Sequence, residues 1–135
     1  MKIGISSTGK DLNAQVDPRF GRCQYFLIVD TDTMNFESIP NESAMASGGA
    51  GIQAAQTIAK AGAEAMVTGN MGPNAFQTLS AAGIKVFTGA TGTTNEAVDK
   101  YKRGELQETD APSVGGHFGM GGAGRGSGRG QGRGL

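Results

Sequence analysis

A chain of 135 residues fits one domain, since domains usually contain about 100 to 200 residues, and it leaves no room for a second. Its longest apolar run falls well short of the roughly 18 residues that a membrane span needs, and its N-terminus lacks the apolar stretch of a signal peptide. The only cysteine, Cys23, cannot form an intramolecular disulfide, so we expect a cytoplasmic protein.

The formal net charge is zero, but the charges are unevenly distributed. Residues 1–114 carry all 12 acidic residues and only 9 of the 12 basic ones, which makes this part negative by 3 charges and the remainder positive by 3. Residues 115–135 contain 11 of the 24 glycines and show no apolar periodicity, so they cannot offset the entropy lost on ordering. We therefore expect a folded domain over residues 1–113 and a disordered Gly/Arg-rich tail over residues 114–135.

The first half of the chain predicts three strands and one helix. Residues 2–6 form the first expected strand, and residues 24–30 form a stronger one that is rich in aromatic and β-branched side chains. A short turn leads to a third, antiparallel strand over residues 34–39, which Pro40 ends because proline cannot donate to a ladder. Residues 51–61 then place their apolar side chains at helical intervals.

The second half predicts strands that alternate with helices. Residues 65–68 and 84–88 read as short strands, and residues 73–82 as a helix with proline at its preferred first-turn position. Thr93 and Glu96 have the spacing of a capping box, which predicts the start of a last helix. The order β-β-β-α-β-α-β-α indicates an α/β fold in which a mixed five-stranded sheet carries helices on its faces.

Each of the three helices is expected to begin directly after a glycine-rich loop that also bears hydroxyl or amide groups: residues 47–51, 68–73 and 88–93. A helix N-terminus carries about half a positive charge, and glycines let a ligand approach the backbone, so such loops are suited to anions. They are equally the ordinary connections and caps of an α/β fold. The capping box accounts for the third loop, whereas residues 43–51 are longer than a connection requires.

A nucleotide-binding motif is not well supported. Gly49, Gly51 and Ala54 have the spacing of the dinucleotide fingerprint with its alanine variant. That fingerprint requires a strand immediately before it and an acidic residue after the next strand, whereas here a strand ended by Pro40 and a long loop precede it and Thr68 closes the following strand. We therefore do not expect a nucleotide.

The segment 17–26 concentrates chemically unusual residues just before the predicted central strand. Arg19 and Arg22 remain charged and suit the binding of an anion, and a nearby guanidinium lowers the pKa of a thiol such as Cys23. The resulting thiolate would suit a soft metal. Packing at the start of a strand is the alternative for Cys23, because free cysteines are usually buried, and redox sensing is another.

The tail contains the only histidine, His117, which is either a loose metal ligand or a solvated side chain. Its three Arg-Gly pairs resemble RNA-binding segments and suggest an alternative function as a nucleic-acid or protein interaction module. Three arginines neutralise about three phosphates. The logarithm of the binding constant for a single strand would then fall with a slope of only about −2 against the logarithm of the salt concentration. We therefore do not expect nucleic acid as the partner. The arginines concerned are Arg125, Arg129 and Arg133.

Five segments together resemble the dinitrogenase iron-molybdenum cofactor-binding family, over about residues 1–110. Their sequences are KIGIS, DPRFGRCQYF, SGGAGI, GNMGPNAF and GATGT, and they occur in the order that is typical of the family. The chain is most similar to the stand-alone archaeal and bacterial members, which commonly end in a glycine-rich tail. The segments are residues 2–6, 17–26, 47–52, 69–76 and 89–93.

The resemblance implies a ribonuclease H-like three-layer fold, in agreement with the predicted strand order. It does not imply nuclease chemistry, because two-metal hydrolysis requires a cluster of carboxylates and the first strand, residues 2–6, has none. No nucleophile beside a base is visible in the sequence either. We therefore do not expect an enzyme.

The resemblance also implies a small carrier or chaperone for an anionic Fe/Mo-type metal-sulfur cluster or its precursor. A permanent iron-sulfur centre needs about four thiolates, and one cysteine with one histidine cannot supply them, so a bound cluster would be transferable. The implied partners are cluster donor and acceptor proteins, and no interaction with a membrane is expected. The chain would be a monomer or weak homodimer. Cys23 and His117 are the candidate metal ligands, and the expected cluster-binding residues are Arg19, Arg22, Cys23, Ser47, Gly48, Gly49, Gly51, Gly69, Asn70, Gly72 and Asn74.

Overall fold

The computed structural model describes residues 1–42 and 49–112 of the chain. The expectations for Ser47, Gly48, His117 and the tail lie outside these residues. Within them, no helix is both long enough and apolar enough to cross a membrane. The elements follow in the order β1 (Lys2–Ser7), η1 (Phe20–Arg22), β2 (Tyr25–Asp30), β3 (Phe36–Pro40), α1 (Ala50–Lys60), β4 (Ala65–Val67), α2 (Pro73–Ala81), β5 (Lys85–Phe87) and α3 (Thr94–Lys102).

The five strands form one mixed sheet in the order β3-β2-β1-β4-β5. β1 lies in the centre, where it pairs antiparallel with β2 and parallel with β4, and β4 pairs parallel with β5. The predicted α/β class, the mixed five-stranded sheet and the order of strands and α-helices are therefore confirmed.

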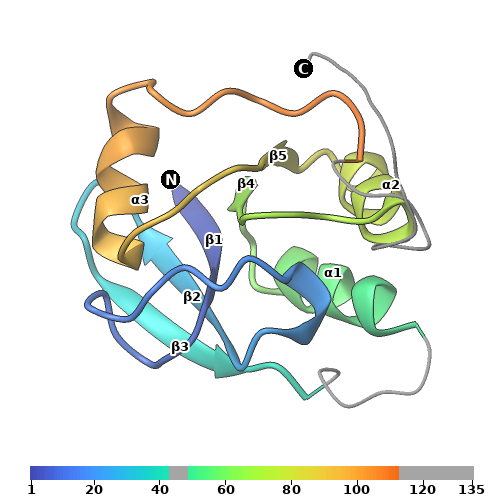
Figure 1. Ribbon diagram of the computed structural model, residues 1–135, viewed down its shortest axis with the longest axis horizontal. Coiled ribbons are helices and arrows are strands. Elements are labelled where there is room, and N and C mark those ends of the chain that lie inside the picture. The colour runs from blue at the N-terminus through green and yellow to red at the C-terminus, as the bar shows by residue number, and fades with distance from the viewer. Residues whose placement is uncertain (43–48, 113–135) are drawn as a thin grey trace.

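Helices cover both faces of the sheet and make three layers (Figure 1). α1 and α2 pack on one face, where Ile58 and Leu79 are fully buried against strand residues such as Met66. α3 packs on the other face, where Val98 is buried beside Ile5. Because both faces are covered, the central strands are apolar on both sides, as the run of buried residues in β2 illustrates.

The helix boundaries follow from local chemistry. Pro73 occupies the first turn of α2. Backbone N–H groups at that position have no hydrogen-bond partner within the helix, so the lack of an N–H in proline costs no helical bond. The predicted capping box of α3 is confirmed, because the Thr93 side chain accepts from the Glu96 N–H at 3.1 Å and the Glu96 carboxylate accepts from the Thr93 N–H at 2.8 Å. Gly62 follows α1 with a φ of +81°, a conformation that glycine adopts without strain.

Two details differ from the sequence-based expectation. Pro40 was expected to lie just beyond the third strand, but it is the last residue of β3 and pairs with Tyr25. An edge strand tolerates a terminal proline because no outer neighbour requires its N–H. The short 3-10 helix η1 was not predicted, since three residues carry no measurable periodicity.

Candidate functional site

The segment of residues 17–23, hereafter the arginine loop, is anchored to the carboxyl ends of the two central parallel strands. The Asp17 N–H donates to the Ser6 carbonyl at 2.9 Å, and the Ser6 hydroxyl donates to the Asp17 carbonyl at 2.6 Å. The Thr68 hydroxyl lies 2.7 Å from that of Ser6, and Thr68 must be the donor because the single Ser6 proton is already used. All three residues are buried, so these bonds fix the loop rigidly.

The loop approaches the segment after β4 at van der Waals distance. A Cβ atom on Gly69 would lie 2.5 Å from Pro18 Cα, which is closer than real Cβ contacts allow. The next residue, Asn70, donates its N–H to the Pro18 carbonyl at 2.8 Å. Gly69 is therefore required by the close approach of two backbones, and this contact accounts for the glycine without any ligand.

The far end of the loop packs against the start of α1, which in turn packs against α2. A Cβ on Gly21 would lie 3.2 Å from both N and Cα of Gly51, and a Cβ on Gly51 would lie 3.3 Å from the Ala75 Cβ. From the core side, Phe20 anchors the loop by packing its ring 5.3 Å from that of Phe26. Small residues thus bring the loop and the first turns of two helices together.

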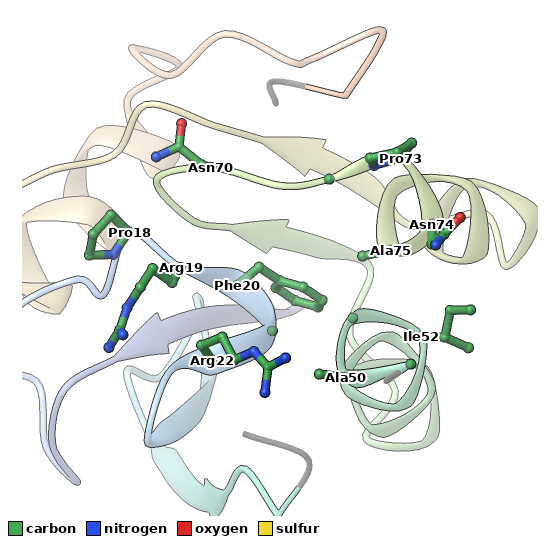
Figure 2. A pocket seen from close by; sticks show the side chains of 14 residues that line it. Pro18, Arg19, Phe20, Arg22, Ala50, Ile52, Asn70, Pro73, Asn74 and Ala75 are labelled. Atoms are coloured by element: carbon green, nitrogen blue, oxygen red, sulfur yellow. The ribbon is translucent and has the colours of Figure 1, made fainter. Parts of the chain in front are cut away.

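The arginine loop, the segment after β4 and the first turns of α1 and α2 surround a cavity of about 560 Å³ (Figure 2). Among the described residues that line it, most contribute apolar or backbone atoms and none contributes a carboxylate. A cavity of this size falls in the range that accommodates small molecules and cofactors. The lining residues are Pro18, Arg19, Phe20, Gly21, Arg22, Gly49, Ala50, Gly51, Ile52, Asn70, Gly72, Pro73, Asn74 and Ala75.

The two helices that begin at the cavity both have a glycine as their N-cap residue. Gly49 is the N-cap of α1 and Gly72 that of α2, neither makes a side-chain capping bond, and neither first turn contains an acidic residue. α1 and α2 therefore place the positive ends of their dipoles at the cavity. By contrast, α3 neutralises its own N-terminus with Glu96.

The two arginines differ in their surroundings. Arg19 donates through Nε and Nη2 to the two carboxylate oxygens of Asp17, both at 3.2 Å, and this pairing raises the pKa of the Arg19 guanidinium. Arg22 ends η1 and extends toward the start of α1, near Ala50 (Figure 2). The sequence named both arginines as candidate anion-binding residues, and the structure pairs Arg19 with the carboxylate of Asp17.

Of the alternatives for Cys23, the structure favours packing in the core. Cys23 is completely buried, its thiol donates to the Phe20 carbonyl at 3.4 Å, and it does not line the cavity. Burial raises the pKa of this thiol to about 12, because desolvation penalises the charged form more than the nearby hydrogen bonds favour it. The Cys23 side chain therefore belongs to the core, and the packing alternative describes it.

The other expected site residues fall into three groups. Arg19, Arg22 and five loop residues line the cavity together, whereas Gly69 adjoins it through its contact with Pro18. Ser47, Gly48 and His117 lie outside the described residues. Among residues 1–42 and 49–112, no three His, Cys, Asp or Glu side chains are close enough to hold a metal ion. The five loop residues are Gly49, Gly51, Asn70, Gly72 and Asn74.

Sequence reasoning missed two buried polar residues that shape the arginine loop. Asp17 binds Arg19, and Asn41 donates its amide to the carbonyls of Gly21 at 3.1 Å and Cys23 at 2.9 Å. Asn41 thereby ties the end of the loop to the end of β3. Its position directly after Pro40 marked it only as a strand terminator, and no local pattern connects it with a loop 18 residues earlier.

Comparison with known proteins identifies the family of this chain. The family model described as dinitrogenase iron-molybdenum cofactor matches residues 1–104, which is most of the sequence. The chain belongs to this family. No curated protein matches it, but solved structures do.

Two structural neighbours of this family member are also similar in sequence. The apo form of the orange protein from Desulfovibrio gigas is 44% identical with a TM-score of 0.81, and the match covers 83% of this chain and 95% of that one. A candidate NifB protein from Thermotoga, described as belonging to the DUF35 family, is 42% identical with a TM-score of 0.70, over 79% of this chain and 91% of that one. A candidate dinitrogenase from Methanocaldococcus jannaschii is 22% identical with a TM-score of 0.63, over 83% and 97% of the two chains, and shows the fold alone.

Proposed function

We propose that the cavity binds an anionic metal-sulfur cluster of the Fe/Mo type, or a precursor of one, and that the protein carries this cluster for storage or transfer. The family is described by the iron-molybdenum cofactor, which supports a role in cofactor binding. The cargo would come from a cluster donor protein and pass to an acceptor protein. Binding and release, not catalysis, are the proposed activity.

One observation carries the proposal: a cavity whose described lining residues include no carboxylate combines Arg22 with the N-terminal ends of α1 and α2. Two helix dipoles and a guanidinium favour an anion, and they matter because residues 1–114 have a net charge of −3. The apolar walls contributed by Phe20, Ile52 and Ala75 suit a large, weakly hydrated sulfide cluster better than a strongly hydrated oxyanion.

The available donor atoms fit a cluster that arrives preassembled. Cys23 is buried as a neutral thiol, and the described residues contain no group of three or more metal-ligating side chains. Such a site would hold a cluster through N–H groups, a guanidinium and apolar contact, and would form few or no bonds to the metal. A cargo held in this way can be handed on without breaking several metal-protein bonds.

The direct test is titration of the cluster-free protein with tetrathiomolybdate, followed by backbone amide chemical shifts. We expect shifts at Arg22, Gly49 and Gly72. Arg22→Gln should weaken binding about tenfold, because a hydrogen bond to a charged group contributes about 1.5 kcal/mol or more. Arg103→Gln is the matched control, since Arg103 is exposed at the end of α3 beside Glu105.

Two outcomes would contradict the proposal. Chemical-shift changes confined to His117 and the tail arginines, without changes at the cavity residues, would show that the ligand binds to the tail instead. An equal loss of affinity in Arg22→Gln and Arg103→Gln would show that only overall charge matters. Selective loss in the Arg22 variant would support the cavity as the site.

A further inference from the structure

The side chain of Asn41, directly after β3, bridges the backbone on the two sides of Arg22. Its Nδ2 group donates to the Gly21 carbonyl at 3.1 Å and to the Cys23 carbonyl at 2.9 Å. The Asn41 backbone N–H also donates to the Gln24 carbonyl at 2.9 Å. Asn41 is only 8% exposed, so these bonds are largely shielded from water. One side chain at the end of β3 therefore holds the residues immediately before and after Arg22.

Two carbonyls that share one donor group make the turn of residues 21–23 hard to rearrange. A primary amide carries two N–H protons, so the Asn41 side chain can satisfy both carbonyls at once. A buried carbonyl that loses its donor is costly, and a shift of the turn away from β3 would take this donor from two of them. The backbone at Arg22 is therefore fixed relative to the sheet by a residue that lies 18 positions after Cys23 in the chain.

The turn that Asn41 holds is the part of the arginine loop that faces the start of α1. A Cβ on Gly21 would lie 3.2 Å from both N and Cα of Gly51, so the two backbones are already in close contact. Gly21 and Arg22 line the cavity, whereas Asn41 is not among the described residues that line it. Figure 2 shows the Arg22 side chain extending from this turn toward the start of α1. Asn41 therefore acts on the cavity through the turn.

We infer that Asn41 is a positioning residue for cargo binding, which holds the turn of residues 21–23 so that Arg22 stays at a fixed place beside the start of α1. This inference rests on the proposed function, in which Arg22 contributes to the binding of the anion. It gives a residue outside the cavity wall a part in the affinity for the cargo. Without the amide bridge the turn could adopt several conformations, and the free energy needed to select one of them would be lost from binding.

A double-mutant cycle between Asn41 and Arg22 tests this inference. Asn41→Leu keeps the approximate size and the neutrality of the side chain and removes its donor. The dissociation constant for tetrathiomolybdate, measured by calorimetric titration of the full chain, should rise about fivefold, a change within the range known for residues that act together. In the Arg22→Gln background, the same substitution should change it by less than about twofold, because the side chain that Asn41 positions is already removed.

A control variant, Thr93→Ala, separates positioning from a loss of stability. Thr93 caps α3, which packs on the face of the sheet opposite to α1 and α2, so this variant should unfold more easily and bind tetrathiomolybdate as before. All titrations are run well below the unfolding temperature of every variant. If Asn41→Leu does not fold, Asn41→Ser enters the same cycle, because a single hydroxyl proton cannot bridge two carbonyls.

The outcomes separate this inference from the function on which it rests. An equal rise of the dissociation constant in both backgrounds, no rise in Asn41→Leu, or an equal rise in Thr93→Ala overturns the inference and leaves binding in the cavity standing. An affinity that Arg22→Gln leaves unchanged removes Arg22 from the site and overturns the inference. No binding by the unchanged protein overturns the proposed function and the inference together. A rise that the Arg22→Gln background abolishes, with Thr93→Ala unaffected, supports the inference.

Discussion

Gly69 and Pro18 touch so closely that a Cβ on residue 69 would lie 2.5 Å from the proline Cα. The φ of Gly69 is outside the left-handed region, so alanine could adopt the backbone conformation and steric conflict alone excludes it. This contact joins the segment after β4 to the arginine loop. The shape of the cavity depends on it because the two segments form adjacent walls.

Replacing Gly69 with alanine should therefore lower the free energy of unfolding by about 3 kcal/mol, the upper part of the range for overpacking, and should also weaken tetrathiomolybdate binding. Gly62→Ala is the control, because Gly62 has open space around its Cα and would suffer only left-handed backbone strain of about 1 kcal/mol. Urea denaturation and binding titration measure the two effects. Unchanged binding in a destabilised Gly69→Ala protein would show that the cavity does not depend on this contact.

The thiol of Cys23 should be unreactive in the folded protein. Because the side chain is fully buried and its pKa is about 12, alkylation by iodoacetamide at pH 8 should be slow in buffer and become fast in denaturant. Cys23→Ala should cost about 1–2 kcal/mol through the small void it leaves, and should not change cluster binding. Rapid alkylation of the native protein would contradict the burial of this residue.

The same thiol predicts a dependence of stability on alkaline pH. Its pKa rises from 9.0 to about 12 on folding, so the folded state favours the neutral thiol and the stabilisation is fully present below pH 9. This contribution is lost as pH rises from 9 toward 12, because ionisation then favours the unfolded chain. The difference in unfolding free energy between the unchanged protein and Cys23→Ala should shrink over that range. A constant difference would mean that Cys23 ionises equally in both states.

Thr93 should affect stability without affecting the site. Thr93→Ala removes the acceptor of the capping box and should cost about 1 kcal/mol, and α3 packs on the face of the sheet opposite to α1 and α2. Thermal unfolding should show the loss, while the affinity for tetrathiomolybdate remains unchanged. A matching loss of affinity would indicate that the cavity responds to any destabilisation, which would weaken the argument from the Arg22 variant.

The glycine-rich tail should be dispensable for folding. The C-terminal part of the described chain is fixed at Thr109, whose N–H donates to the Val86 carbonyl at 2.7 Å, and residues 115–135 offer little apolar surface to bury. A chain that ends at Ser113 should therefore unfold at the same temperature as the full protein. A clear drop in that temperature would show that the tail packs on the domain.

The sequence by itself determined the strands, the α-helices and their order. Strand and helix periodicities, the proline of α2 and the capping box of α3 are local signals, because they depend on residues at most a few positions apart. The arginine loop and the glycines before α1 and α2 were visible for the same reason. Family resemblance then indicated what kind of cargo such loops would hold.

Only the tertiary structure decided which of these residues meet and in what state. In the sequence, Cys23 and Arg19 are both candidate site residues in one short segment. In the fold, Cys23 is buried as a neutral thiol, whereas Arg19 pairs with Asp17. Asn41 joins the loop from another strand. Which side chains are buried, and which groups they pair with, depends on contacts between segments far apart in the chain. These contacts decide whether a thiol ionises and whether a charge is balanced by a neighbouring group. The sequence therefore identified the candidate residues, whereas the fold determined which of them line the cavity.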